Sequence, residues 1–405
     1  MTLMTNMIHI VIGSDLFKPS IGGTETVTHN MGVNLTKAGF KVTVIAPAPK
    51  DMQTTPKVEK DPGGYTIVRV RSYGIPIQQN LRFSKHAYKQ IAEYLDNPSN
   101  TPDIIHCNNP FPTSRELIKY AKKHDLPLVI GSHLMPESFT TSIRRLGGLH
   151  HLLDAMGWHY IARVYNKADR VVAPTQTALN YLLEHGLKVP TQAISNGIDL
   201  AANAPLRVDK AKLKRELGIK SQYVVVYAGR LSVEKRIDVV MAAFARLVDQ
   251  YDVELILIGD GNARQTLEKQ AKRLGVQDKV LFTGFVQELE QKRRYMAVSD
   301  VFAIASPVEL QSIVALEAMT AGLPILAVNE GALPELAQKG VNGGTFTDGD
   351  SVGLARMIGG LLSDPELLKQ YRQGSLDIIK HHDIHDTWKQ YSEMYKAVIA
   401  KHNNS

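Results

Sequence analysis

The residues of this chain best suited to chemistry are two glutamates around an expected helix start. Glu309 and Glu317 stand eight positions apart, and Ser312 lies between them where a helical pattern begins. Eight helical residues extend about 12 Å, so the two carboxylates cannot act as an acid–base pair on one bond. They can bind hydroxyl groups at two ends of an extended molecule, while the helix N-terminus between them suits a phosphate. A sugar hydroxyl, a diphosphate and a ribose hydroxyl in that order describe a nucleotide sugar.

Two cations follow another expected strand and could serve the same ligand. Arg230 and Lys235 lie in the segment 229–235, which reads GRLSVEK. Cations at both ends of a strand–helix turn converge on one place and suit a diphosphate, whereas a surface ion pair with the neighbouring glutamate is the alternative. The pair Gly22-Gly23 precedes the first expected helix. It could admit a phosphate or sugar close to the backbone, or form only a tight turn.

Short β-branched runs alternate with helical patterns along the chain, and this alternation must position the residues above. The pattern is typical of parallel sheets with helices on both faces, and 405 residues allow two such sheets. The expected fold class is α/β, with two doubly wound parallel-sheet, Rossmann-like domains and a boundary near 197–220. Because ligands of such sheets bind beyond the carboxyl ends of the strands, the site is expected in the cleft between the domains. Strands are expected at 8–12, 41–46, 66–70, 103–107, 128–131 and 170–173, and then at 223–228, 254–258, 280–283, 301–305 and 324–328.

The composition is that of an ordinary globular protein. Apolar residues make up 44% and charged residues 21%, which excludes collagen-like, disordered and disulfide-scaffold classes. No apolar run reaches the ~18–20 residues of a membrane span, and no basic segment with an apolar core marks a secretion signal. The single cysteine, Cys107, cannot form an internal disulfide. These features predict a cytoplasmic location.

The net charge of +7 is concentrated in the first half of the chain. Residues 1–200 hold 21 Lys and Arg against 15 Asp and Glu, while the remainder holds 26 against 25. An anionic partner of the first half, such as lipid headgroups, is one interpretation, and a scattered solvated surface is the other. No long basic block, zinc-ligand spacing or aromatic RNA-binding signature is present, so nucleic acid is not expected as a partner.

Several motifs together resemble the retaining family-4 glycosyltransferases of the GT-B fold. They are Glu309–Glu317 followed by AMTAGLP, the segment 229–235, SNGID at 195–199, PDIIH at 102–106 and the N-terminal Gly22-Gly23. The motifs run in the family's order over nearly the whole chain. The resemblance implies an acceptor-binding domain at 1–200, a nucleotide-sugar-binding domain at 201–380 and a C-terminal helix at 381–405 that crosses back to the first domain.

The resemblance also implies a role for each motif. Arg230 and Lys235 would bind the donor diphosphate, Glu309 the transferred sugar and Glu317 the ribose. His133, which follows the expected strand 128–131, would face the sugar and the acceptor. No metal or other cofactor is expected, because the cations and the helix dipole take that part. The implied catalytic residues are His133, Glu309, Arg230 and Lys235, and the implied donor-binding residues are Gly22, Gly23, Arg230, Lys235, Val286, Glu309, Leu310, Gln311, Ser312, Ile313 and Glu317.

Two departures from the commoner family pattern concern the substrates. Many relatives have Gly-Phe-Gly after the first glutamate, whereas this chain has LQS at 310–312, and LMPE follows His133. Both segments resemble bacterial glycolipid-synthesising members such as the diacylglycerol glucosyltransferases. The resemblance therefore implies transfer of glucose from UDP-glucose to a lipid hydroxyl, by an enzyme peripheral on the inner face of the cell membrane. The alternatives are a GDP-mannose donor, a soluble sugar acceptor, a nucleotide-sugar 2-epimerase and a non-catalytic binding module.

Two stretches of the first half are candidates for contact with an anionic membrane. Residues 73–94 and 142–165 combine Arg or Lys with Leu, Ile and aromatic residues, as helices lying among headgroups do. The alternative is that both stretches only cover the first sheet. The residues concerned are Leu81, Arg82, Phe83, Lys85, Tyr88, Lys89 and Ile91 in the first stretch, and Arg144, Arg145, Leu146, Leu149, Leu152, Leu153, Trp158, Ile161, Arg163 and Val164 in the second.

Three further motifs are interpreted without a ligand. Asp348-Gly349-Asp350 matches an Asp-x-Asp metal motif but lies in a Gly-rich loop, which predicts a solvated turn. The GDG segment at 259–261 lacks the third glycine of a dinucleotide fingerprint. The histidines at 381, 382 and 385 have no carboxylate or cysteine cluster in the nearby sequence, which indicates a surface position.

Overall fold

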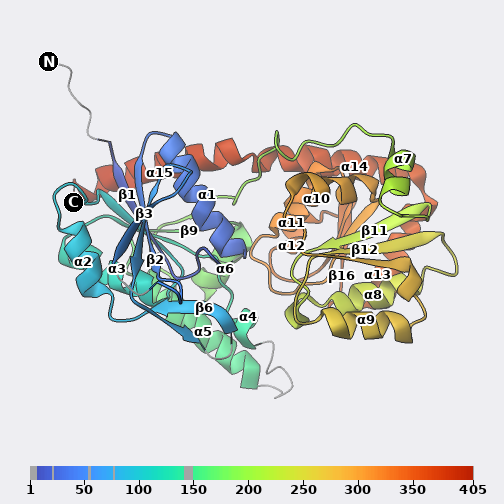
Figure 1. The fold of residues 1–405 in the computed structure, drawn as a ribbon, viewed down its shortest axis with the longest axis horizontal. Coiled ribbons are helices and arrows are strands. Elements are labelled where there is room, and N and C mark those ends of the chain that lie inside the picture. The colour runs from blue at the N-terminus through green and yellow to red at the C-terminus, as the bar shows by residue number, and fades with distance from the viewer. Residues whose placement is uncertain (1–6, 21, 53–55, 76–77, 141–148, 405) are drawn as a thin grey trace. The chain divides into compact units, whose positions relative to one another are not determined.

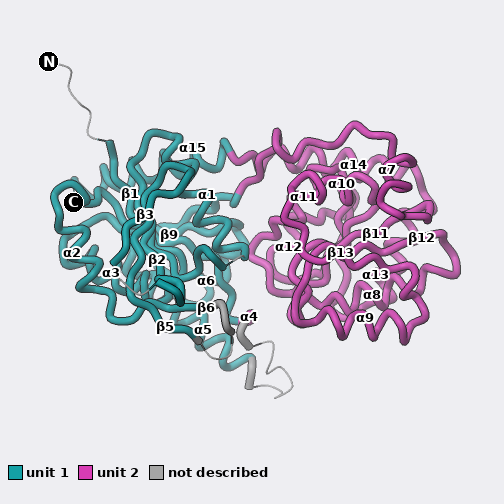
Figure 2. The backbone as a smooth tube through the Cα atoms, in the orientation of Figure 1, with its two compact units in different colours: residues 1–136, 151–196, 385–405 teal, residues 137–150, 197–384 magenta. Residues whose placement is uncertain are grey.

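The chain folds into two compact units, each built on one sheet. The structure is a computed structural model that describes residues 7–20, 22–52, 56–75, 78–140 and 149–404. Unit 1 consists of residues 1–136, 151–196 and 385–405, and unit 2 consists of residues 137–150 and 197–384 (Figure 2).

Unit 1 contains an eight-stranded sheet. Its strands are β1 (His9–Ser14), β2 (Lys41–Pro47), β3 (Lys57–Lys60), β4 (Thr66–Val70), β7 (Ile104–Asn108), β8 (Leu128–Gly131), β9 (Arg170–Ala173) and β10 (Thr191–Ala193). The strand order is β10-β9-β8-β7-β1-β2-β4-β3, and every neighbouring pair is parallel except β3 with β4. Every residue of β1, β4, β7 and β8 is buried, as strands covered on both faces require. The helices of the first part of the chain are α1 (Gly23–Lys37), α2 (Tyr88–Leu95), α3 (Pro112–Lys123), α4 (Glu137–Thr140), α5 (Leu149–Tyr165) and α6 (Gln176–Glu184). The last helix of the chain, α15 (Ile384–His402), also belongs to unit 1 except for its first residue.

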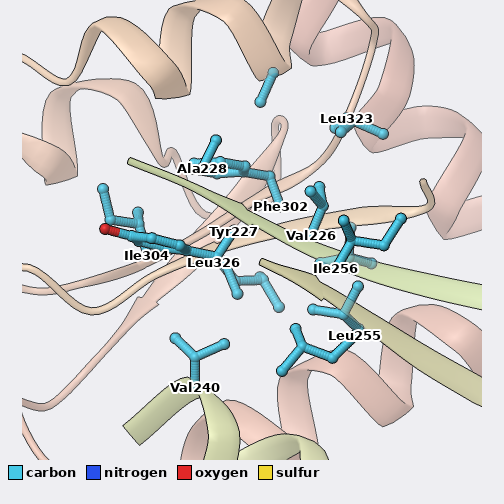
Figure 3. Packing of buried hydrophobic residues seen from close by; sticks show 14 of the residues in the cluster. Val226, Tyr227, Ala228, Val240, Leu255, Ile256, Phe302, Ile304, Leu323 and Leu326 are labelled. Atoms are coloured by element: carbon cyan, nitrogen blue, oxygen red, sulfur yellow. The ribbon is translucent and has the colours of Figure 1, made fainter. Parts of the chain in front are cut away.

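Unit 2 contains a six-stranded, fully parallel sheet. Its strands are β11 (Tyr223–Ala228), β12 (Val253–Ile258), β13 (Val280–Gly284), β14 (Val301–Ile304), β15 (Ile325–Val328) and β16 (Gly343–Phe346), in the order β13-β12-β11-β14-β15-β16. Its helices are α7 (Lys210–Glu216), α8 (Ile237–Ala245), α9 (Arg264–Arg273), α10 (Leu289–Val298), α11 (Ile313–Thr320), α12 (Leu333–Leu336), α13 (Ser351–Ser363) and α14 (Pro365–Ile379), with short 3₁₀ turns η2 (Val233–Lys235), η3 (Gln277–Lys279) and η4 (Lys380–His382). Helices α8, α9 and α13 cover one face of the sheet and α10, α11 and α14 the other (Figure 1). Val226, Ile256 and Phe302 are fully buried in the core between them (Figure 3).

The sequence-based prediction of two doubly wound, Rossmann-like parallel sheets is confirmed. Strands β4, β8, β9 and β11 have the predicted bounds, and the other predicted strands are shifted at their ends. The pattern did not predict β3, β10 and β16, nor a two-stranded antiparallel hairpin of β5 (Ser72–Ile75) and β6 (Gln78–Ser84).

The prediction of one amphipathic helical stretch over 73–94 is wrong. The segment forms the β5–β6 hairpin followed by α2. Ile91 is completely buried, and the Arg82 guanidinium donates to the carbonyl of Ala48 and to the Ser72 hydroxyl. Ile91 and Arg82 therefore stabilise unit 1 internally, whereas Lys85 and Lys89 of the same stretch are exposed.

Helix α5 has an exposed apolar face that differs from the predicted one. Trp158, Ile161 and Val164 are at most 9% exposed and belong to the core. Leu152, Met156 and Tyr160 are instead 58%, 60% and 46% exposed and recur every four residues, so they lie on one side of the helix. Arg144 and Arg145 lie outside the described residues. No helix among the described residues is long and apolar enough to cross a bilayer.

The C-terminal helix α15 is anchored in unit 1 by aromatic residues and one buried hydrogen bond. Trp388, Tyr391 and Tyr395 are at most 5% exposed. The Tyr395 hydroxyl lies 2.8 Å from Nδ1 of His106, a completely buried residue of β7. Since Trp158 also belongs to unit 1, both tryptophans of the chain report on this unit.

Unit 1 buries several groups whose protonation differs between the folded and unfolded chain. Burial lowers the pKa of His9 and of His133 to about 4 and that of His106 to about 3. Burial also raises the pKa of Asp15 to about 6, although Thr113 and the Ser84 N–H donate hydrogen bonds to its carboxylate. In the unfolded chain, histidine has a pKa of about 6.5 and aspartate of about 3.9.

We expect unit 1 to lose stability as the pH falls from 7 to 5. Near pH 5 the unfolded chain binds three protons on these histidines, while the folded chain binds one on Asp15, a net difference of about two protons. The free energy of unfolding then falls by about 1 kcal/mol per pH unit near pH 7 and by about 3 kcal/mol per pH unit near pH 5. Urea unfolding followed by tryptophan fluorescence at both pH values measures the effect. His133→Asn should make the loss smaller, and equal urea midpoints at both pH values would contradict the expectation.

Candidate functional site

The order of the strands in unit 2 reverses between β11 and β14. The chain leaves β11 toward β12 on one side, whereas β14 lies on the other side and leads to β15. The loops that follow β11 and β14 therefore diverge at the carboxyl ends of these strands, which is where open parallel sheets bind ligands. The predicted site residues Arg230, Lys235 and Glu309 all follow one of these two strands.

A direct ion pair joins the two loops. The Lys235 ammonium lies 2.7 Å from Oε1 of Glu309 and 3.4 Å from the hydroxyl of Ser306. The side chains of Lys235 and Glu309 remain 23% and 15% exposed, so a ligand can still reach them. Arg230 is exposed beside them, and its guanidinium forms no ion pair with any described residue. The structure thus brings a cation pair and a carboxylate to one edge of the sheet.

The loop after β11 is held by close backbone contact with the loop after β12. The N–H of Leu231 donates to the carbonyl of Asp260 at 2.9 Å. Gly259 has φ +137°, and a Cβ atom there would lie 2.0 Å from the carbonyl oxygen of Gly229. Only glycine permits this approach. The GDG segment at 259–261 therefore supports the turn that carries Arg230.

The backbone of Glu309 is fixed by the loop that follows β15. The N–H of Ala332 donates to the Glu309 carbonyl at 2.8 Å. Gly331 has φ +58°, and a Cβ atom there would lie 2.6 Å from the same oxygen. The loop after β15 can approach the Glu309 carbonyl this closely because residue 331 is glycine and has no side chain.

Helix α11 starts at Ile313, shortly after Glu309, and offers backbone donors. The Ser312 hydroxyl caps the helix by accepting from the Ala315 N–H at 3.3 Å. The N–H groups of Ile313 and Val314 precede the first intrahelical hydrogen bonds and carry the positive end of the helix dipole. Leu310 and Gln311 are each 7% exposed, so their side chains are buried.

Glu317, the second glutamate of the motif, lies on the face of α11 that meets α10. Its Oε1 atom is 2.6 Å from the Lys292 ammonium. Its Oε2 atom is buried and has no hydrogen-bond partner among the described residues. Glu317 and Lys292 line a cavity together with Arg293, Thr320 and residues 203–206. A buried carboxylate oxygen without a donor is suited to bind a hydroxyl group.

Val286, predicted to lie near a nucleotide base, follows β13 at the edge of the sheet. Its side chain is partly buried and packs against the core of unit 2, whereas the neighbouring Phe285 ring is 59% exposed. The position offers backbone groups and an exposed aromatic ring, and no described residue there distinguishes one base from another.

The remaining predicted site residues belong to unit 1. His133 follows β8, its N–H donates to Oδ1 of Asn109 at 3.1 Å, and its Nε2 atom is buried. The low pKa of His133 keeps this ring neutral at pH 7, and Nε2 has no hydrogen-bond partner among the described residues. Gly22 caps α1 with an extended backbone, and Gly23 is the first residue of that helix.

Some residues that shape the site were not identified from the sequence. Lys292, the partner of Glu317, belongs to no recognisable motif. Arg236 and Asp348 form an ion pair beside Lys235 although they lie 112 positions apart. The only sequence signal for this pair was the Asp-Gly-Asp segment, which was interpreted as a solvated turn.

Comparison with known proteins identifies two family matches that together span most of the chain. Residues 21–202 match the family described as Glycosyltransferase Family 4, and residues 209–376 match Glycosyl transferases group 1. The fold is also that of sucrose-phosphate synthase from Thermosynechococcus elongatus, with a TM-score of 0.81 at 18% identity over 97% of this chain and 100% of the other.

The names of two curated relatives contain different sugars and different lipids. One is alpha-monoglucosyldiacylglycerol synthase of Streptococcus pneumoniae, 27% identical over 325 residues, which cover 79% of this chain and 71% of the relative. The other is a GDP-mannose-dependent alpha-(1-6)-phosphatidylinositol dimannoside mannosyltransferase of Mycobacterium tuberculosis, 25% identical over 361 residues, or 89% of each chain.

The contact between Gly331 and Glu309 generates a stability prediction. Gly331→Ala should destabilise unit 2 by about 2 kcal/mol, because the left-handed backbone costs about 1–2 kcal/mol for alanine and the new Cβ collides with the Glu309 carbonyl. Calorimetric unfolding measures the change. Gly360→Ala is the matched control: this position in α13 is exposed with open space around it, so alanine should stabilise the helix. Unaltered unfolding of Gly331→Ala would contradict the assignment.

Proposed function

Because this chain belongs to the family 4 glycosyltransferases of GT-B fold, we propose that it transfers glucose from UDP-glucose to a hydroxyl of a lipid acceptor such as diacylglycerol. The observation that carries the proposal is the Lys235–Glu309 pair at the β11/β14 edge, with Arg230 and the start of α11 beside it. The name of the S. pneumoniae relative favours this donor sugar and acceptor. The GDP-mannose-dependent relative makes mannosyl transfer the second candidate.

In the proposed mechanism, unit 2 stabilises the leaving nucleotide. Arg230, Lys235 and the amides of Ile313 and Val314 bind the diphosphate, whose negative charge grows as the bond to the sugar breaks. The departing β-phosphate accepts the proton of the acceptor hydroxyl on the same face of the sugar, so the anomeric configuration is retained. Glu309 binds a hydroxyl of the transferred sugar.

Two further residues complete the proposed site. Glu317 binds the ribose hydroxyls through its unpartnered Oε2 atom. His133 contributes a neutral ring nitrogen to the sugar and the acceptor. Because cationic side chains and amides neutralise the diphosphate, we propose that the reaction needs no metal ion, and that the protein works in the cytoplasm at the membrane surface.

We expect UDP, and not GDP, to raise the melting temperature of the wild-type protein, because binding to the folded state stabilises it. Lys235→Ala and Arg230→Ala should weaken this response and reduce glucosyl transfer about 10²–10³-fold, since each removes a donor that stabilises the developing charge. Transfer should continue in EDTA, and NMR of the product should show an α-linkage.

The matched control is Lys269→Ala, which removes an exposed lysine of α9 far along the chain from both loops. It should leave donor binding and turnover as in the wild type. If GDP alone raised the melting temperature, the proposal of glucosyl transfer would be wrong and mannosyl transfer would take its place. Near-wild-type turnover of both Lys235→Ala and Arg230→Ala would remove the donor-site assignment.

The exposed stripe of Leu152, Met156 and Tyr160 on α5 gives the proposed membrane contact a specific surface. Vesicles containing anionic lipid should bind the protein in co-sedimentation, and high salt should weaken binding because each Lys or Arg near the surface contributes about 1 kcal/mol. Replacing the three residues by glutamine should weaken binding at least about tenfold, since the insertion of each apolar side chain contributes on the order of 1 kcal/mol.

The matched controls are Leu183→Gln and Val208→Gln, which replace apolar side chains outside α5 that are 43% and 47% exposed. Both variants should bind vesicles as the wild type does. If the wild-type protein stays in the supernatant with every lipid, the lipid acceptor is wrong and a soluble acceptor replaces it.

A further inference from the structure

We propose that Asp348 is a positioning residue for donor binding, which acts by holding Arg236 in the backbone conformation that directs Lys235 toward Glu309. Asp348 lies in the turn between β16 and α13, far along the chain from Lys235. The inference rests on the proposed function, because it assumes that Lys235 binds the donor diphosphate.

Arg236 has an unusual backbone for its residue type. It separates the short turn η2 from α8, with φ +50° and ψ +38°. This left-handed conformation is unfavourable for a residue with a Cβ atom and needs support from its surroundings. The N–H of Arg236 donates to the carbonyl of Val233 at 3.2 Å, and its own carbonyl accepts from the N–H of Val239 at 3.0 Å. Arg236 is thus the point at which the chain turns from η2 into α8.

The side chain of Arg236 supplies that support through Asp348. Its Nη1 atom lies 2.9 Å and 3.1 Å from the two carboxylate oxygens of Asp348, and its Nε lies 3.5 Å from Asp238. The side chains of Arg236 and Asp348 are 28% and 29% exposed, so the pair is shielded more than an ordinary surface pair. A guanidinium held by two carboxylates has few other positions available.

The turn that carries Asp348 is itself fixed. The N–H of Asp350 donates to the carbonyl of Thr347 at 2.9 Å, and the Asp350 carboxylate caps α13 by accepting from the N–H of Gly353 at 2.8 Å. The two aspartates of the Asp-Gly-Asp segment therefore have different tasks. Asp350 starts a helix, and Asp348 faces the Lys235 turn.

The backbone conformation of Arg236 determines where Lys235, the residue directly before it, places its side chain. The backbone of Lys235 is fixed by a hydrogen bond from its N–H to the carbonyl of Ser232, and its ammonium reaches Ser306 and Glu309. If Arg236 relaxed to a right-handed conformation, the direction of the chain between η2 and α8 would change, and the Lys235 side chain would move with it. Asp348 would then influence the donor without touching it.

The test measures UDP affinity by calorimetric titration in three single variants and one double variant. Asp348→Ala should weaken UDP binding about tenfold. Asp348→Asn, which keeps an acceptor but loses the charge, should have a smaller effect. Arg236→Gly should bind UDP within about twofold of wild type, because glycine adopts the left-handed conformation without support. Added to Arg236→Gly, Asp348→Ala should have no further effect.

Two further variants separate positioning from a general structural role. In a Lys235→Ala background, Asp348→Ala should leave the remaining UDP affinity unchanged, since it acts through that lysine. Asp350→Ala removes the cap of α13 and should lower the melting temperature while leaving UDP affinity intact.

The outcomes distinguish this inference from the proposed function. If Asp348→Ala binds UDP as the wild type does while Lys235→Ala does not, the positioning role is wrong and the donor site stands. If Asp348→Ala weakens UDP equally with and without Lys235, the aspartate acts by another route and the inference is again wrong. If Lys235→Ala itself binds UDP normally, the proposed donor site fails.

Discussion

The reversal of strand order between β11 and β14 is the constraint on which the candidate site depends. The connection after β11 leads to one side of the sheet and the connection after β14 leads to the other. The loops that follow these two strands therefore leave an opening between them, which side chains from both loops can reach. The Lys235–Glu309 ion pair crosses that opening. Three other loops support the two that form it: the segment after β12 packs on Leu231, the segment after β15 holds the Glu309 carbonyl, and the turn after β16 binds Arg236. The loops after five strands of unit 2 thus determine where one ammonium and one carboxylate lie.

The parts of the fold that the sequence predicted well are those with buried, β-branched strands. Tyr223–Ala228 and Leu128–Gly131 are short apolar runs between polar turns, and the structure has strands with the same bounds. β16 was not predicted because its sequence, GGTF, has a low strand propensity and pairs only at the edge of the sheet. The β5–β6 hairpin was mistaken for part of a helix, because its mixture of basic and apolar residues fits either period.

The site was predicted residue by residue from motifs, whereas the partners of those residues were not. A motif records residues that are neighbours along the chain, but the contacts of Glu317 with Lys292 and of Arg236 with Asp348 join residues 25 and 112 positions apart. Helix α5 shows the same limit: Trp158 was included among the residues that could contact a membrane, although it is 2% exposed. Which face of a helix is buried depends on the sheet it packs against, and the sequence of the helix alone does not contain that information.

The central claim is that unit 2 binds a nucleotide sugar at the β11/β14 edge, and hydrogen–deuterium exchange of the whole protein with and without UDP tests it most directly. Bound UDP should slow exchange in peptides covering 229–236 and 309–316, where the Lys235 turn and the start of α11 lie. Peptides from α9 and from the β3–β4 edge of unit 1 should exchange at the same rate with and without UDP. Protection confined to other segments, with 229–236 and 309–316 unaffected, would contradict the account.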